Sequence, residues 1–211
     1  MHIFSIEGNI GVGKTTFINM IKEASHEKHI IYLEEPVNEW LSIKNNENKT
    51  ILELFYADQD TYAFSFQMMA YISRLALLKK TIKEHPDAII ITERSVYSDR
   101  HIFAKMLFDD EKIEDVNYQI YNKWFDHFVE DVPISKIIYL KCDPSIALSR
   151  VLKRNRLGET IPLEYLEECH NYHENWLLKT DTETLIIDAN KENTEAQVSI
   201  WKKELATFLN L

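Results

Sequence analysis

The chain has 211 residues, of which 45% are hydrophobic and 27% charged, as is usual for a globular protein that buries its own core. The formal net charge of −10 argues against a nucleic-acid-binding surface and against an anionic membrane as a partner. No apolar run reaches the ~20 residues of a membrane span, and Met1 leads directly into a strand-like run, so we expect a cytoplasmic protein without a leader.

Short apolar runs rich in isoleucine alternate with longer segments of helical periodicity. The predicted strands are Ile3–Ile6, Ile30–Leu33, Ala88–Thr92, Ile137–Leu140 and Leu185–Ile187. The predicted helices are Lys14–Ala24, Thr61–Glu84, Ser95–Phe108, Val116–Glu130, Ser145–Arg154, Leu163–Leu178 and Thr194–Leu209. This alternation predicts an α/β fold, a five-stranded parallel sheet with helices on both faces, in a single domain over residues 1–211. Because such sheets bind ligands beyond the carboxyl ends of their strands, the residues that follow each strand are the candidates for a site.

A glycine-rich loop follows the first strand: Gly8-Asn9-Ile10-Gly11-Val12-Gly13-Lys14-Thr15-Thr16. An average chain of this length would carry roughly 15 glycines, whereas this one has four, three of them in this loop. The loop matches G-x-x-x-x-G-K-[ST], with a strand before it and a helix after it. Its N–H groups would cradle phosphates at the positive end of the helix. Lys14 would reach the β- and γ-phosphates, and the Thr15 hydroxyl would bind Mg²⁺.

Acidic residues end the second and third strands. Pro36 holds Glu35 in an extended conformation at the tip of the second strand, where a carboxylate could act as a general base or bind a metal. A solvated acidic turn is the alternative. Glu93 ends the third strand, the place where phosphate-loop proteins carry an acid that works near Mg²⁺. Arg94 beside it could form an ordinary ion pair with Glu93.

The helix after the fourth strand ends in a basic cluster that consists of Arg150, Lys153, Arg154 and Arg156. In an acidic protein this cluster predicts a site for a polyanion. With Gly158 as a joint, it would form a lid over about residues 150–160 that closes on ATP. The alternative is a solvated basic helix end stabilised by the helix dipole.

Among the aromatic side chains of the long segment Ile51–Lys80 lie Gln67 and Arg74, which are seven residues apart and therefore share a helix face. The aromatic side chains are explained by core packing, but a glutamine and an arginine on an apolar face need partners. A nucleobase could supply them.

These segments together resemble the deoxyribonucleoside kinase family, from the first strand to about Asn190. Besides the glycine-rich loop and the Ile6-Glu7 that precedes it, the resemblance rests on Glu35-Pro36-Val37-Asn38-Glu39-Trp40, Phe66-Gln67, Glu93-Arg94-Ser95-Val96-Tyr97-Ser98-Asp99-Arg100, Arg150-Val151-Leu152-Lys153-Arg154-Asn155-Arg156 and Ile161-Pro162-Leu163-Glu164-Tyr165-Leu166. It implies the P-loop kinase fold, ATP as phosphoryl donor, Mg²⁺ as cofactor, a deoxynucleoside as acceptor and a homodimer formed by helix packing.

The resemblance also implies roles for individual residues. Lys14, Glu35 and Arg94 would be catalytic, with Glu35 as the general base for the 5′-hydroxyl and Arg94 as the group that orients it and stabilises phosphoryl charge. Glu93 would hold Mg²⁺ through water, and Thr15 would bind it directly. ATP would be bound by Gly8, Asn9, Ile10, Gly11, Val12, Gly13, Lys14, Thr15, Thr16, Arg150, Arg154 and Arg156.

The nucleoside pocket would contain Ile10, Glu35, Trp40, Leu52, Phe55, Tyr56, Phe66, Gln67, Arg74, Arg94, Asp99, Phe103 and Glu159. Within it Gln67 would bind the base edge, Phe66 and Phe103 would stack on the base, and Tyr56 with Glu159 would read the 3′-hydroxyl. Arg74 only donates and Asp99 only accepts, so the pair suits an exocyclic amino group beside a ring acceptor. We therefore expect deoxyadenosine, deoxycytidine and deoxyguanosine to be favoured over thymidine. The alternative is a surface Arg–Asp ion pair.

Three other functions remain to be weighed. A thymidylate-type kinase would need extra cations for its phosphorylated acceptor. A regulatory GTPase would need D-x-x-G and N-K-x-D motifs, but Asn190-Lys191-Glu192-Asn193 lacks the final Asp. A non-catalytic nucleotide-binding partner would not need Lys14, Glu35 and Arg94 intact.

Overall fold

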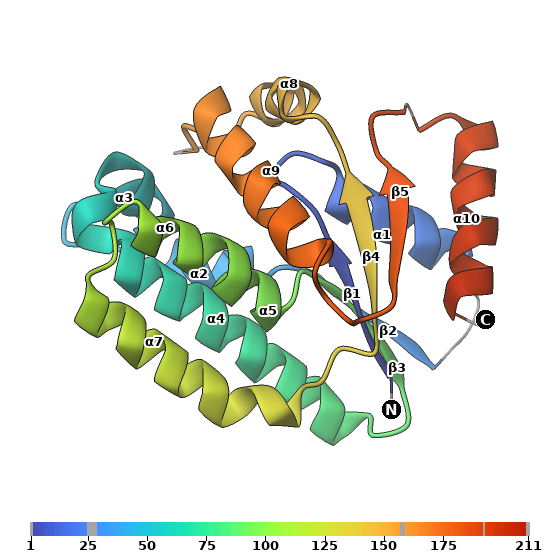
Figure 1. Ribbon diagram of the computed structural model, residues 1–211, viewed down its shortest axis with the longest axis horizontal. Coiled ribbons are helices and arrows are strands. Elements are labelled where there is room, and N and C mark those ends of the chain that lie inside the picture. The colour runs from blue at the N-terminus through green and yellow to red at the C-terminus, as the bar shows by residue number, and fades with distance from the viewer. Residues whose placement is uncertain (1, 25–28, 157–158, 192, 210–211) are drawn as a thin grey trace.

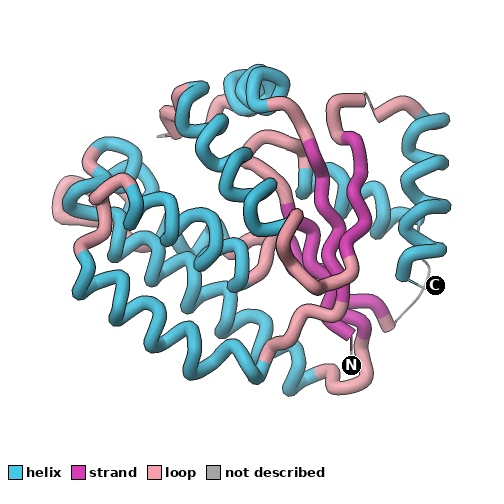
Figure 2. The backbone as a smooth tube through the Cα atoms, in the orientation of Figure 1, coloured by secondary structure: helices cyan, strands magenta, loops and turns pink. Residues whose placement is uncertain are grey.

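In the computed structural model, five parallel strands form one sheet in the order β2-β3-β1-β4-β5 (Figure 1). The strands are β1 His2–Glu7, β2 Ile30–Leu33, β3 Ile89–Glu93, β4 Lys136–Lys141 and β5 Thr184–Asp188. The structure describes residues 2–24, 29–156, 159–191 and 193–209. Since all strands run in the same direction, as the arrows in Figure 1 show, their carboxyl ends meet at one edge of the sheet. Figure 2 shows the strands side by side with helices around them. The glycine-rich loop, Glu35 and Arg94 follow three adjacent strands at that edge.

Helices cover both faces of the sheet. They are α1 Lys14–Ala24, α2 Val37–Ser42, α3 Ile51–Ala57, α4 Gln59–Glu84, α5 Val96–Ser98, the π-helical turn η1 Asp99–Ala104, α6 Lys105–Asp109, α7 Asp115–Phe128, the 3₁₀ turn η2 Val129–Asp131, α8 Pro144–Arg154, α9 Leu163–Leu177 and α10 Glu195–Leu209.

Alternate residues of β1 supply two different cores, because successive side chains of a strand point to opposite faces. Phe4 and Ile6 pack in one core with side chains of α1, α8 and α10. Ile3 packs in the other core with side chains of α4 and α7. The two groups of helices lie on opposite sides of the sheet in Figure 1. None of the helices within the described ranges is long and apolar enough to cross a membrane.

The predicted strands and most predicted helices are confirmed, with ends that differ by a few residues. The two short helices α2 and α3 were not predicted, although Thr50 and Glu53 form a capping box at the start of α3. The single helix predicted over Ser95–Phe108 is interrupted by the π-helical turn η1. Such turns recur at functional sites, and this one carries Asp99 and Phe103.

Candidate active site

The loop between β1 and α1 requires glycine at two points. Gly8 has a φ of +147° and Gly11 a φ of +82°, conformations that residues with a side chain rarely adopt. A Cβ on Gly8 would lie 2.6 Å from the carbonyl oxygen of Leu140, and a Cβ on Gly11 would lie 2.4 Å from that of Ala147. The loop therefore packs closely against β4 and α8 before it enters α1, whose N-terminal N–H groups favour an anion.

Lys14 is buried beneath this loop. Its Nζ donates to the carbonyl oxygens of Gly8 at 3.2 Å and of Asn9 at 2.8 Å. Burial and the neighbouring Arg94 lower the pKa of Lys14 to about 7, and the carboxylate of Glu93 opposes them only in part. A triphosphate beside this amine would favour its charged form.

Glu35 follows β2 and forms ion pairs with two guanidinium groups, of which Arg74 also donates a hydrogen bond to it. Nη2 of Arg74 lies 3.0 Å and Nε of Arg94 lies 3.1 Å from the same atom, Oε1. Burial raises the pKa of Glu35, but Arg94, Arg74 and Lys14 outweigh burial and lower it to about 2. The side chain is 19% exposed, so the alternative of a solvated acidic turn is wrong. Because both contacts use Oε1, the second carboxylate oxygen is left for a substrate.

Arg94 has a φ of +62°, in the left-handed region. A residue other than glycine held there costs on the order of 1–3 kcal/mol and is a recurrent feature of functional sites. Nη1 of Arg94 donates to the Gly8 carbonyl at 2.9 Å, and its guanidinium carbon lies 4.7 Å from the ring centroid of Phe103. Within the described residues, Arg94 forms its ion pair with Glu35 and not with its neighbour Glu93, so that alternative is wrong.

Arg74 and Asp99 form a buried pair, with residue exposures of 5% and 2%, so the alternative of a surface ion pair is wrong. Nε of Arg74 donates to Oδ2 of Asp99 at 2.9 Å, and Nη2 donates to Oδ1 at 3.4 Å. Nη1 donates to the backbone carbonyl of Glu93 at 2.7 Å, and Nη2 also reaches Glu35. These four bonds leave one of the five guanidinium N–H groups for another acceptor.

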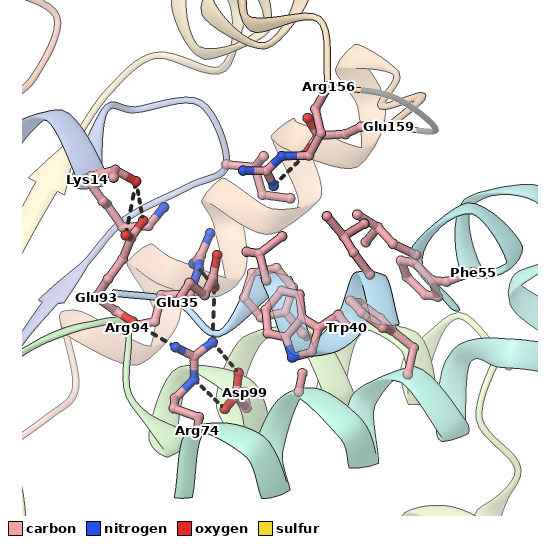
Figure 3. A pocket seen from close by; sticks show the side chains of 18 of the residues that line it. Lys14, Glu35, Trp40, Phe55, Arg74, Glu93, Arg94, Asp99, Arg156 and Glu159 are labelled. Atoms are coloured by element: carbon pink, nitrogen blue, oxygen red, sulfur yellow. Dashed lines mark hydrogen bonds and ion pairs between the residues drawn. The ribbon is translucent and has the colours of Figure 1, made fainter. Parts of the chain in front are cut away.

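A cavity of about 400 Å³ lies beside these charged groups and is lined by every residue that the resemblance assigned to the nucleoside pocket. Its walls are aromatic: the ring of Phe66 stacks on Phe55 at 4.6 Å and meets Trp40 edge-on at 5.5 Å. Trp40 is held in place by a hydrogen bond of 2.9 Å from its Nε1 to Ser73. Figure 3 shows two groups of charged side chains at the cavity: Glu35, Arg94, Arg74 and Asp99 lie together, and Glu159 lies apart from them beside Arg156.

Gln67 lines the same cavity and is only 2% exposed. Among the described residues, its carboxamide has no hydrogen-bond partner. Buried amides in folded proteins are hydrogen-bonded as a rule, so this one needs a partner that enters the cavity. Tyr56 is half-buried at the Glu159 end, and desolvation, together with the Glu159 carboxylate, raises its pKa.

A second cavity, of about 680 Å³, lies over the phosphate loop and is lined by Gly11, Val12, Gly13, Lys14, Thr15, Thr16, Arg150, Lys153, Arg154 and Arg156, among others. Arg154 and Arg156 line both cavities, and both pair with Glu159. Arg150 donates to the carbonyl of Val12 at 3.1 Å. The predicted lid over residues 150–160 includes Leu157 and the joint Gly158, which lie outside the described residues.

Not every residue of the predicted ATP site faces this second cavity. Ile10 lines the first cavity, and Gly8 and Asn9 line neither of the two. The Asn9 side chain donates to the carbonyl of Leu166 at 2.7 Å and so ties the loop to α9. Gly8 and Asn9 thus support the shape of the loop, and their contact with ATP stays a prediction.

Thr15 and Glu93 meet at the boundary between the two cavities. Oγ1 of Thr15 lies 3.0 Å from each carboxylate oxygen of Glu93. Hydroxyl and carboxylate oxygens are the hard ligands that Mg²⁺ prefers, and Mg²⁺ keeps several of its waters when it binds. The pair fits a magnesium ion held partly through water.

The nucleoside-pocket prediction omitted several residues that line the first cavity: Glu34, Val37, Asn38, Leu41, Ala70 and Tyr165. Ala70 could have been found from spacing, because it lies between Gln67 and Arg74 at helical intervals of three and four residues. The other positions come from loops and helices whose mutual arrangement no local pattern reveals.

Comparison with known proteins agrees with this geometry. Residues 4–210 match the deoxynucleoside kinase family. Human deoxycytidine kinase is 33% identical over an alignment of 238 positions that covers 97% of this chain and 91% of that protein. The mitochondrial deoxyguanosine kinase of Xenopus laevis is 32% identical over 198 residues, covering 85% of this chain and 74% of that protein. A probable deoxycytidine kinase of fowlpox virus is 38% identical over 177 residues, covering 82% and 70%.

Proposed function

The chain belongs to the deoxynucleoside kinase family and is a deoxyribonucleoside kinase, and from this premise we propose that it favours deoxycytidine, deoxyadenosine and deoxyguanosine over thymidine. The reaction transfers a phosphoryl group from ATP to a deoxynucleoside and gives ADP and the 5′-monophosphate, a step of nucleoside salvage. The family match favours none of the other functions weighed above, namely a thymidylate-type kinase, a GTPase or a non-catalytic partner.

The unpartnered carboxamide of Gln67 is the observation that carries the proposal of a nucleobase in this cavity. An amide presents a donor and an acceptor side by side, which complements the edge of a nucleobase. The aromatic rings of Phe66 and Phe103 line the same cavity and offer faces for a base. An uncharged, flat and polar-edged ligand suits this arrangement better than a phosphorylated one does.

The Arg74–Asp99 pair supports the preference among bases. Asp99 receives one bond on each oxygen and keeps lone pairs that can accept from an exocyclic amino group, while Arg74 keeps one N–H for a ring acceptor. Cytosine and adenine present such a pair of groups. Thymine places a carbonyl opposite the carboxylate, and its methyl group would crowd the pair.

Glu35 is the proposed general base. Its ionised carboxylate has one oxygen fixed by Arg74 and Arg94 and the other available to accept the proton of the 5′-hydroxyl. A positioned base of this kind contributes typically 10²–10⁴ in rate. Arg94, which also contacts the phosphate loop through Gly8, would orient Glu35 and stabilise the charge of the transferred phosphoryl group.

The phosphates of ATP would lie on the loop around Lys14, with Arg150, Arg154 and Arg156 as further cations. Thr15 and Glu93 would hold Mg²⁺, which neutralises phosphate charge when it is bound. Since Arg154 and Arg156 face both cavities, they are suited to contact the phosphoryl group between donor and acceptor.

The 3′-hydroxyl of the deoxyribose would be recognised on another side of the nucleoside cavity, while its 5′-hydroxyl faces Glu35. Tyr56 and Glu159 line the cavity there, and their hydroxyl and carboxylate suit the 3′-hydroxyl of the sugar. Glu159 also pairs with Arg154 and Arg156, so sugar recognition and the basic cluster share this carboxylate.

A homodimer is the proposed assembly. Val116, Ile120 and Trp124 are four residues apart on α7 and are 64%, 41% and 47% exposed, and Ile72 on the adjacent α4 is 40% exposed. A face of large apolar side chains is typical of a homodimer interface. Light scattering should give twice the chain mass at micromolar concentration, and a monomer there would contradict the proposal.

Calorimetric titration of deoxycytidine into Gln67→Ala tests the carrying observation. Each neutral hydrogen bond lost is worth about 0.5–1.5 kcal/mol, so the loss of two should weaken binding by roughly 5- to 150-fold. Gln119→Ala, a change of the same kind on the exposed face of α7, is the control. Unchanged binding in Gln67→Ala would remove the support for a base in this cavity.

A further inference from the structure

A buried carboxyl lies behind the active site and takes no part in the reaction described above. Glu7 is the last residue of β1 and has an exposure of 0%. Its Oε1 accepts from the Ser95 hydroxyl at 2.6 Å, and among the described residues Oε2 has no hydrogen-bond partner. Glu7 lines neither of the two cavities, so it touches neither nucleoside nor ATP.

No cation is paired with this carboxyl within the described residues. Arg74 and Arg94 form their ion pairs with Glu35 and Asp99, and Lys14 donates to loop carbonyls. Burial raises the pKa of Glu7, more than its bond with Ser95 and the charges nearby lower it. Burying a carboxyl without a paired cation costs free energy of folding. The part of the chain that its hydrogen bond to Ser95 holds in place indicates what the carboxyl does.

Three hydrogen bonds join residues 94 and 95 to residues 6, 7 and 8. The Arg94 N–H donates to the Ile6 carbonyl at 2.9 Å, the Ser95 hydroxyl donates to Glu7, and the Arg94 guanidinium donates to the Gly8 carbonyl at 2.9 Å. Glu7 supplies the only side-chain acceptor of the three. The bond of the Arg94 N–H precedes the Arg94 φ angle of +62° along the chain, and the bond of Ser95 follows it, so the two hold the backbone on either side of this angle.

A left-handed arginine persists only where its surroundings over-determine it. If the Ser95 bond is removed, the chain after Arg94 loses an anchor, and the backbone can relax toward a common conformation. Such a relaxation would turn the Arg94 side chain away from Oε1 of Glu35, now at 3.1 Å, and from the ring of Phe103. A misplacement of about 1 Å in a catalytic arrangement can cost about 10² in rate.

We propose that Glu7 is a positioning residue, which through Ser95 holds the left-handed turn of Arg94 and thereby keeps the Arg94 guanidinium against Glu35. This inference rests on the proposed roles of Arg94 and Glu35. It assigns a function in the reaction to a side chain that never contacts a substrate.

The test compares Glu7→Leu with Glu7→Gln. Leucine has a similar volume but no acceptor, whereas glutamine keeps an oxygen that can accept from Ser95. We expect Glu7→Leu to lower kcat at least about tenfold while KM for the nucleoside stays within about threefold, and Glu7→Gln to recover kcat to within about threefold of wild type. Ser5→Ala is the matched control, because Ser5 lies on the same face of β1, is equally buried and has an unpartnered hydroxyl; its kcat should not change.

Ser95→Ala removes the same bond from the other side and keeps the inference testable if Glu7→Leu does not fold. It should lower kcat without a matching rise in the nucleoside KM. Ser95→Ala also removes the N-cap bond that the Ser95 hydroxyl accepts from the Ser98 N–H. In the double variant Glu7→Leu/Ser95→Ala the losses should therefore not fully multiply, since the Glu7–Ser95 bond that both substitutions break is lost only once. The folded fraction of each variant is determined by urea denaturation, and each rate is divided by that fraction.

Several results would overturn the inference: an unchanged kcat in folded Glu7→Leu or in Ser95→Ala, a loss in Glu7→Gln as large as in Glu7→Leu, or fully multiplicative effects in the double variant. The comparison uses whichever deoxynucleoside the wild-type enzyme phosphorylates fastest. An incorrect substrate preference therefore leaves this test intact, and a failure of the general-base assignment appears separately in variants of Glu35.

Discussion

Replacement of Glu35 by glutamine separates the chemical step from binding. The substitution keeps the shape of the side chain and its Oε1 acceptor for Arg74 and Arg94, but it removes the negative charge and the ability to take a proton. Lys14→Ala acts at the opposite end of the reaction, on the phosphates. The two variants should therefore fail in different ways.

The magnitude follows from the surroundings of Glu35. Loss of a positioned base lowers kcat by roughly 10²–10⁴, which corresponds to about 3–5 kcal/mol in activation free energy. The pKa of Glu35 falls from 4.5 to about 2, which corresponds to a loss of stability on the order of 3 kcal/mol when the charge is removed. Rates therefore have to be normalised to the folded fraction.

The assay is steady-state ADP release with deoxycytidine and ATP varied in turn. Glu35→Gln should lower kcat by at least about 10² while KM for both substrates stays within about threefold. Lys14→Ala should raise KM for ATP as well as lower kcat. Glu39→Gln, an exposed acid on α2 outside both cavities, is the control and should behave as wild type. A near-normal kcat in folded Glu35→Gln would refute the general-base assignment.

Two further predictions follow from the same network. The double variant Arg74→Met/Asp99→Ala should raise the ratio of kcat/KM for thymidine over deoxycytidine by at least about tenfold, because both partners of the buried pair leave together and make room for the 5-methyl group; an unchanged ratio would contradict the proposed base contacts. The Glu35 carboxylate has a lowered pKa, so its contribution to stability is complete above pH 4.5 and is lost as pH falls toward 2. In urea denaturation the stability deficit of Glu35→Gln should thus be larger at pH 7 than at pH 3, and an equal deficit at both values would show that the charge pairing contributes nothing.

The outline of the site could be predicted because its chemistry lies in local patterns. The spacing of Gly8, Gly13 and Lys14 between a strand and a helix specifies a phosphate loop without reference to the rest of the chain. Glu35 and Arg94 follow apolar runs, and parallel strands bring such ends together. The walls of the nucleoside cavity are different, since their assignment came from the resemblance to a family and not from periodicity.

The contacts that bind these parts into one network could not be predicted from the sequence. Helical spacing places Gln67 and Arg74 on one face of α4, but it does not reveal that Arg74 reaches Glu35, 39 residues earlier. The left-handed conformation of Arg94 cannot be recognised in the sequence, because the residue at this position is not glycine. Nothing in the sequence near Glu7 indicates that its carboxylate accepts a hydrogen bond from Ser95, 88 residues later.

Initial rates of ADP release with the four deoxynucleosides, and with dTMP as a further acceptor, test the central claim most directly. The account predicts turnover of deoxycytidine, deoxyadenosine and deoxyguanosine, much slower turnover of thymidine, and none of dTMP. A preference for thymidine over all three amino-bearing nucleosides would contradict the assignment of Arg74 and Asp99 to the base, and phosphorylation of dTMP alone would contradict the nucleoside site itself.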